Sequence, residues 1–327
     1  MDKPQEEMQE VGFFGIYKES VKTILSWKKL FTQITLTFIL PLSFIFLLHI
    51  VISDVIDWRI ENDEDRLDYR GGNDHLYRRL SSEWIGYWIF RLVYLSFLLL
   101  FSLLSTAAIV YTIAVKYSGD EVTFKKVLKI VPKVWKRLAL TFLWTYFGFF
   151  IYNVVAGVVV YIWSTTTTDS TFSVVLFYIL VAIYCVGFIY ITAVWQLASV
   201  VTVLESSYGL QAMMKGSALI KGKRWLSWFV FFGLYCIFVG ILIVFYLFVW
   251  YGFMGLIIGI LCIFLLMDLF LLGYVVQTML YLVCKSYHRE PIDKLGLSSQ
   301  LGGYLGEFEP AFKVNKDIQL GQPQVEV

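Results

Sequence analysis

Long apolar stretches separated by charged segments dominate the chain. Six stretches reach the roughly 20 residues that a helix needs to cross a hydrocarbon core of about 30 Å. They cover residues 31–52, 86–113, 138–163, 172–203, 226–250 and 254–283. The two turns near 164–171 and 250–254 are short, whereas residues 53–85 form a longer polar segment. The pattern predicts an all-α integral membrane protein with six transmembrane helices.

A short amphipathic stretch precedes the first, third and fifth of these spans. Its apolar residues recur at helical spacing and its charged residues fall on the opposite side, which is typical of a helix lying on the membrane surface. The stripe before span 1 contains Phe14, Tyr17, Val21, Ile24 and Leu25, and the stripe before span 3 contains Phe124, Val127, Leu128, Val131, Val134 and Trp135. The stretch before span 5, with Leu210, Met213, Met214 and Ile220, is weaker.

A cluster of tryptophan and basic residues, here called a collar, follows each amphipathic stretch. The three collars are Trp27, Lys28 and Lys29; Trp135, Lys136 and Arg137; and Lys223, Arg224 and Trp225. Tryptophan prefers the headgroup region, and each lysine or arginine attracts anionic lipid by about 1 kcal/mol. The collars either only anchor the helices or also recruit lipid. Their recurrence, each before two spans, predicts three parallel hairpin repeats.

Composition and charge distribution extend this interpretation. The chain is 58% hydrophobic and 16% charged, far from the balance of soluble proteins. Of its 27 lysines and arginines, twenty-one lie in the N-terminal arm, the loops after spans 2 and 4, and the C-terminal tail. Five lie in residues 53–85 and one, Arg91, in span 2. The positive-inside rule therefore predicts that both termini are cytosolic.

The same reasoning divides the chain into three parts. Residues 1–30 are expected to form a cytosolic arm with an interfacial helix, 31–283 the six-span domain, and 284–327 a cytosolic tail. Residues 53–85 carry nine acids and five arginines, and we expect an outer loop that is solvated and partly disordered.

Three polar residues within the spans, Asp268, Arg91 and His49, are candidate functional residues. Asp268 lies near the middle of span 6, where an ionised carboxylate is costly, so it should face the bundle, have a partner such as Arg91 or the hydroxyls of span 2, or stay protonated. It either serves a transport path or is a protonated packing residue. His49 lies eight residues after Pro41, which is expected to kink span 1. Cys284, beside Lys285, is either a palmitoylation site or an unmodified thiol.

No motif in the sequence predicts catalysis. There is no glycine-rich phosphate loop, nucleophile elbow or metal-ligand cluster, so we expect no enzyme activity, no cofactor and no metal site. The lysines of the basic loops alternate with apolar residues, as in membrane-surface helices, which argues against nucleic-acid binding.

Several runs of residues resemble known families. Residues 201–205, 211–217 and 221–225 resemble the six-span membrane domain fused to some bacterial glycerophosphodiester phosphodiesterases, and the YciC-like inner-membrane proteins. Residues 38–43 and 101–108 are similar to a plant family of uncharacterised six-span proteins, some labelled polyadenylate-binding-protein-binding protein. The resemblance spans residues 10–290 and implies the fold. The phosphodiesterase catalytic domain is absent, so its activity is not implied.

Two functional hypotheses follow. The first is a non-enzymatic protein that organises anionic lipid or a partner protein at the cytosolic leaflet, using the collars and the amphipathic helices. The lysines before span 3 are Lys125, Lys126, Lys129 and Lys133. The alternative is a small-solute transporter or channel with a polar path at Asp268.

Overall fold

The structure, a computed structural model, is helical throughout the ranges that it describes, which are residues 12–70, 74–118, 122–166 and 171–289. Six helices are long and apolar enough to cross a membrane. The first runs over Lys28–Asp65 and consists mostly of α4 (Leu40–Arg70). The others lie in α5 (Asp74–Ser118), α6 (Phe124–Thr166), α7 (Thr171–Leu204), α9 (Arg224–Phe248) and α10 (Gly252–Tyr287). The prediction of an all-helical, multi-pass membrane protein with six spans is confirmed.

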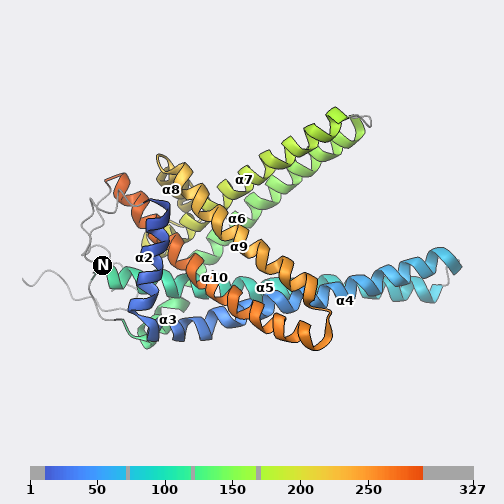
Figure 1. Cartoon of the computed structure of the whole chain (residues 1–327), viewed down its shortest axis with the longest axis horizontal. Helices are drawn as coiled ribbons and strands as arrows, with labels where there is room; N and C mark the ends of the chain where they lie inside the picture. The colour runs from blue at the N-terminus through green and yellow to red at the C-terminus, as the bar shows by residue number, and fades with distance from the viewer. Residues whose placement is uncertain (1–11, 71–73, 119–121, 167–170, 290–327) are drawn as a thin grey trace, which may run out of the picture.

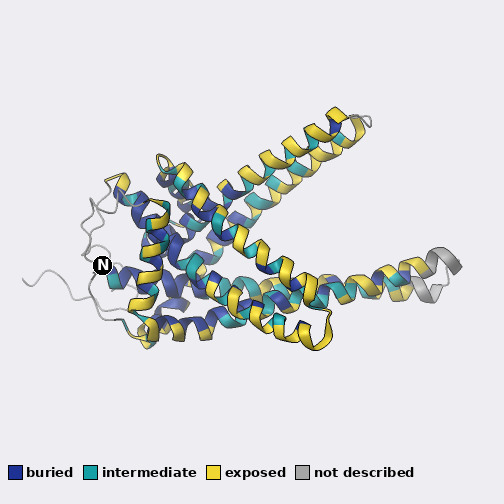
Figure 2. Ribbon diagram, in the orientation of Figure 1, coloured by how far each residue is buried: buried dark blue, intermediate teal, exposed yellow. Residues whose placement is uncertain are grey.

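The long helices pair as three hairpins, α4–α5, α6–α7 and α9–α10, that share a core at one end (Figure 1). The arms of α4–α5 and α6–α7 diverge away from this core. Residues 107–115 of α5, 192–204 of α7 and 275–284 of α10 are almost entirely buried there, whereas the arms are largely exposed (Figure 2). A helix that is apolar on all sides can lie against protein or against lipid, and these three segments lie against protein.

Short helices cover the core end. Helix α2 (Phe13–Ser26) packs against α10 and α9, and α8 (Leu210–Ile220) packs against α7. Helix α2 buries Ile16, Ser20 and Thr23 against the protein and exposes Phe14 and Leu25, two members of the predicted apolar stripe. The protein-facing side of α2 therefore differs from the stripe read in the sequence.

The stretch before span 3 is not a separate helix, contrary to the predicted arrangement. It is the first part of α6, which continues through Pro132. Its apolar residues Val127, Val131 and Val134 are buried in the protein core rather than turned to lipid. The helix continues because it gains protein contacts along this face, and these outweigh the cost of an internal proline.

The expectation of an outer loop over residues 53–85 is wrong. Helix α4 continues to Arg70 and α5 begins at Asp74, so nearly all of this segment is helical. An ion pair of 3.0 Å joins Arg79 Nε to the buried carboxylate of Asp63 across the hairpin. Ile60 is also buried between the two helices. The apolar positions among the charges follow helical spacing, which a count of acids and arginines overlooks.

The helix of the first span widens just before Pro41. Helix α3 (Lys28–Ile34) leads into a π-helix, η1 (Thr35–Ile39), and the N–H of Leu40 bonds to the carbonyl of Thr35, five residues back. Proline lacks an N–H and its ring clashes with the carbonyl four residues earlier. The π-turn accommodates the ring within a continuous span, so the predicted distortion takes this form.

The ends of the predicted membrane domain shift slightly. Helix α10 ends at Tyr287, so residues 284–287 belong to the last span rather than to the tail. Residues 1–11 of the predicted arm and 290–327 of the predicted tail lie outside the described residues.

Candidate functional site

A cavity of about 340 Å³ lies where the three hairpins meet. All six long helices contribute to it, and eight of its sixteen lining residues are aromatic. The lining residues include Phe46 of α4, Phe142 of α6, Trp195 of α7, Phe231 and Phe238 of α9, and Phe270 of α10. The lining contains no charged residue. A mostly apolar cavity of this size with a few polar groups is typical of small-molecule sites.

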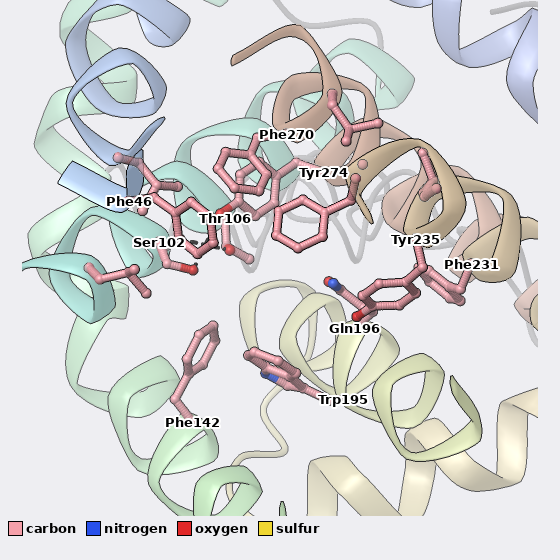
Figure 3. Close-up of a pocket in the computed structure, with 16 residues that line it drawn as sticks. Phe46, Ser102, Thr106, Phe142, Trp195, Gln196, Phe231, Tyr235, Phe270 and Tyr274 are labelled. Carbon is pink, nitrogen blue, oxygen red and sulfur yellow. Dashed lines mark hydrogen bonds between the residues drawn. The ribbon is translucent and has the colours of Figure 1, made fainter. Parts of the chain in front are cut away.

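The polar groups of the cavity lie mainly on one side of it. Ser102 and Thr106 of α5 face Tyr274 of α10, and the Ser102 and Tyr274 hydroxyl oxygens are 3.3 Å apart (Figure 3). Gln196 of α7 extends its amide toward the cavity from another side. The sequence had suggested the hydroxyls of Ser102 and Thr106 as partners of Asp268. The structure brings them to Tyr274 instead.

Asp268 does not face the bundle, so that expectation is wrong. Its side chain is exposed on the outer face of α10, beside the exposed residues Phe264 and Leu265. Within the described residues its carboxylate has no ion pair with Arg91 and no contact with the cavity. Helical spacing places residues 264, 265 and 268 on one side, whereas the inner side carries 266, 269 and 273.

Arg91 and His49 belong to the α4–α5 arm and not to the cavity. Arg91 is exposed, and its guanidinium lies 4.7 Å from the centre of the Tyr87 ring. His49 stacks on the Tyr94 ring at 3.5 Å between centroids, and its Nε2 lies 3.1 Å from the hydroxyl of Ser53. The His49–Tyr94 stack joins the two helices of the arm, whereas the Arg91–Tyr87 contact lies within α5.

At each collar one cation lies over an aromatic ring near the core end of the molecule, and at the first collar this cation is Lys116 of α5, which is not itself a collar residue. Lys116 lies over Trp27, Arg137 over Tyr208, and Lys223 over Tyr287, at 5.1, 5.8 and 5.4 Å from the ring centres. The other basic collar residues, Lys28, Lys29, Lys136 and Arg224, are exposed. Trp135 and Trp225 are also exposed, at 40% and 77%. The collars therefore combine a fixed cation with exposed charges and indole rings.

A partly buried ion-pair network lies at the same end and was missed in the sequence. Glu205 accepts hydrogen bonds from the Tyr281 hydroxyl at 2.6 Å and from Lys285 Nζ at 2.9 Å, both on Oε1. Its Oε2 lies 2.5 Å from Lys215 Nζ. Burial raises the pKa of the Glu205 carboxyl, but the hydrogen bonds and the nearby ammonium outweigh burial and hold the pKa below its ordinary value of 4.5.

The turn between α7 and α8 positions this carboxylate. Gly209 adopts a positive φ of 62°, which glycine tolerates without a side-chain clash, and its N–H donates to the hydroxyl of Thr141 at 2.9 Å. The turn returns the chain so that α8 carries Lys215 to Glu205. Gly216, next in sequence, lies where a Cβ would be 3.1 Å from the backbone of Ala198 and of Val194. Glu205, Lys215 and Gly216 belong to the runs that carried the family resemblance.

Cys284 is completely buried, so its thiol is not accessible to an acyl donor in this structure. Its place beside Lys285 near the end of the last span had suggested palmitoylation. The helix continues for three residues beyond it and packs against its neighbours, and this removes the exposure that the proposal needs.

Comparison with known families assigns the chain as a whole. A family model described as "Domain of unknown function (DUF8558)" matches residues 1–323. No curated protein and no solved structure matches the chain. The resemblances to the bacterial membrane domains and to the plant family therefore stay predictions. Because the family model covers nearly the full length, the chain belongs to the DUF8558 family.

Proposed function

We propose that this protein is a non-enzymatic membrane protein that organises anionic lipid, or a partner protein, at the cytosolic leaflet. The observation that carries the proposal is the gathering of exposed basic side chains and tryptophans at the shared-core end. The beginnings of α6 and α9 and the α2–α3 junction lie at this same end of the molecule, away from the divergent arms (Figure 1). In this proposal the core end is cytosolic and the three hairpins are parallel repeats of one unit.

The first part of α6 supports this proposal in detail. Lys125, Lys126 and Lys129 are exposed, while Val127 and Ile130 between them are buried. The buried face fixes the helix to the protein, so the lysine face has a defined direction. A fixed row of ammonium groups near a negatively charged leaflet gains about 1 kcal/mol per residue from lipid.

A charge-matched pair of variants tests the proposal. We expect Lys125→Gln with Lys129→Gln to weaken the binding of phosphatidylserine by roughly 30-fold, because two contributions of about 1 kcal/mol are lost. The control, Arg59→Gln with Arg78→Gln, removes two exposed charges from the α4–α5 arm. Native mass spectrometry with titrated phosphatidylserine or phosphatidylcholine measures the bound lipid.

Two results would count against lipid organisation. Equal phosphatidylserine binding by the two variants would show that the lysines have no special position. Equal binding of phosphatidylserine and phosphatidylcholine by the unmodified protein would show that charge is not recognised. A protein that co-purifies with the unmodified chain and is lost only from the lysine variant would favour the partner form of the proposal.

The alternative of a transporter with a polar path at Asp268 gains no support from the site geometry. A path through the bundle would pass the cavity, and Asp268 does not line it. The polar side chains that line the cavity include Ser102, Thr106, Gln196, Tyr235 and Tyr274.

A further inference from the structure

Gln277 is an unexplained polar residue in the core. It is fully buried, and neither its amide nitrogen nor its amide oxygen has a hydrogen-bond partner among the described residues. Leaving a buried polar group unpaired costs about 1–3 kcal/mol. Such groups are rare in native structures and mark positions where a water, ion or ligand completes the hydrogen bonds.

The position of Gln277 connects it with the cavity. It follows Phe270, Gly273 and Tyr274 by seven, four and three residues on α10, so it shares their helical face. All three of those residues line the cavity. Ser43, which follows the lining residue Leu42, is also buried with an unpaired hydroxyl. The amide therefore lies about one helical turn from the cluster of Ser102 and Tyr274.

These observations define the chemistry of an occupant. Aromatic and aliphatic side chains surround most of the cavity and favour an apolar body. The absence of charged lining residues disfavours a phosphate or carboxylate, whose desolvation would not be repaid. Hydroxyls and amides both donate and accept hydrogen bonds, and so does the hydroxyl group of a neutral lipid.

We propose that the cavity between the three hairpins binds one neutral lipid. Its apolar body packs among the aromatic rings, and its single hydroxyl bonds the Ser102 and Tyr274 hydroxyls at the cavity wall and reaches the Gln277 amide, which lies one helical turn beyond them and does not itself line the cavity. Sterols and diacylglycerols share this chemistry. The site is distinct from the collars and needs no anionic headgroup, so it stands or falls independently of the proposed lipid organisation at the leaflet.

A glycine in the cavity wall allows a clean test. A Cβ added at Gly273 meets no atom within 4 Å, so Gly273→Leu fills the cavity without displacing the backbone. Gly240 on α9 also has open space around a Cβ, but it is exposed and does not line the cavity. Gly240→Leu is therefore the matched control for helix propensity and side-chain size.

The experiment uses the full chain in nanodiscs with two photoreactive probes, a diazirine sterol and a diazirine diacylglycerol. Each is competed with its unlabelled parent and with the acetate ester of that parent, which lacks the hydroxyl. We expect one probe to label cavity residues, with Gly273→Leu reducing labelling at least about tenfold and Gly240→Leu leaving it unchanged. Which probe labels identifies the lipid.

Two further variants test the hydroxyl cluster. We expect Tyr274→Phe to weaken competition by the parent lipid about fivefold, as for loss of one neutral hydrogen bond. Gln277→Leu should weaken it similarly and yet raise the melting temperature of the lipid-free protein, because it removes an unpaired buried amide. A merely structural role of Gln277 predicts a lower melting temperature and unchanged competition.

The proposal is overturned if neither probe labels the cavity, which would leave it filled by water alone. It is also overturned if the Gly273→Leu protein is labelled as strongly as the Gly240→Leu protein, because the labelled surface would then lie outside the cavity. If the parent lipid and its acetate ester compete equally well, the hydroxyl group does not contribute to binding. That result would also contradict the proposal.

Discussion

Glu205 and Lys215 form an ion pair of 2.5 Å between Oε2 and Nζ across the turn that joins α7 to α8. The other carboxylate oxygen bonds Tyr281 and Lys285, which lie one turn apart on α10. A single carboxylate therefore ties three helices together at the core end. Its side chain is only 13% exposed, so water cannot replace the lost partners if one is removed.

Replacing Glu205 with glutamine should destabilise the protein. The change leaves two ammonium groups close together without their counter-charge, and breaking a largely buried pair costs about 3 kcal/mol. Thermal melting in detergent micelles measures the effect. Glu61→Gln, at an exposed position of α4, is the control and should change the stability by less than about 0.5 kcal/mol. A similar melting temperature for both variants would contradict the role assigned to the network.

The same carboxylate should make stability depend on acid. Because the folded state holds the pKa of Glu205 below its unfolded value of 4.5, the group stabilises the protein fully above this pH. That contribution falls as the pH drops from 4.5 toward the lower folded pKa. The difference in melting temperature between the unmodified protein and Glu205→Gln should therefore shrink between pH 5 and pH 3. A constant difference over this range would argue against the depressed pKa.

Gly216 should not tolerate a methyl group. A Cβ at this position would lie 3.1 Å from Ala198 N and from Val194 O, both backbone atoms of a rigid helix. We expect Gly216→Ala to lower the melting temperature, although alanine favours helices by about 1 kcal/mol over glycine. Gly148→Ala is the control, because its Cβ would meet only the end of Met213 at 4.0 Å. An increase in stability for both variants would show that α7 and α8 can separate freely.

Asp268 should be a source of instability rather than of function. A carboxylate at the centre of a membrane helix costs about 2.5–3.5 kcal/mol, and this one is exposed on the outer face of α10. We expect Asp268→Leu to raise the melting temperature in nanodiscs, whereas Asp57→Leu, at an exposed position in the α4–α5 arm, has little effect. A loss of stability in Asp268→Leu would reveal a partner on this face.

The number and positions of the spans could be predicted because transmembrane length is set by the bilayer. Span 6 was expected over 254–283, and α10 runs from Gly252 to Tyr287. The extension at the C-terminal end arises from protein contacts, since Cys284 and Ser286 are buried by neighbouring helices, whereas Gly252 and Phe253 at the other end are exposed. Such contacts cannot be read from a hydropathy pattern.

The errors have a common physical origin. Counting charges in residues 53–85 predicted a loop, but Asp63 is buried by its pair with Arg79 from the other helix of the hairpin. The charge of Asp268 predicted that its side chain points into the bundle. The direction depends instead on where residue 268 falls around the axis of α10 relative to the core. Both outcomes depend on which residues of distant segments meet.

The site itself was largely beyond the sequence for the same reason. Glu205 and Lys285 are 80 residues apart and neither belongs to a chemical motif. Tyr274 and Ser102 are separated by 172 residues. The collars were visible because their residues are adjacent in the chain, whereas the cavity arises only when all six helices converge.

Because α4 and α5 pair along their arm, the polar end of α4 is a rigid helical rod, here called the strut. At about 1.5 Å per residue, residues 53–70 of α4 extend roughly 27 Å. Their charge keeps most of this length out of the hydrocarbon, so it stands in the aqueous phase. The Asp63–Arg79 pair holds the two helices in register. Whatever binds along this strut is held at a fixed height above the membrane, and the number of residues in the two helices sets that height.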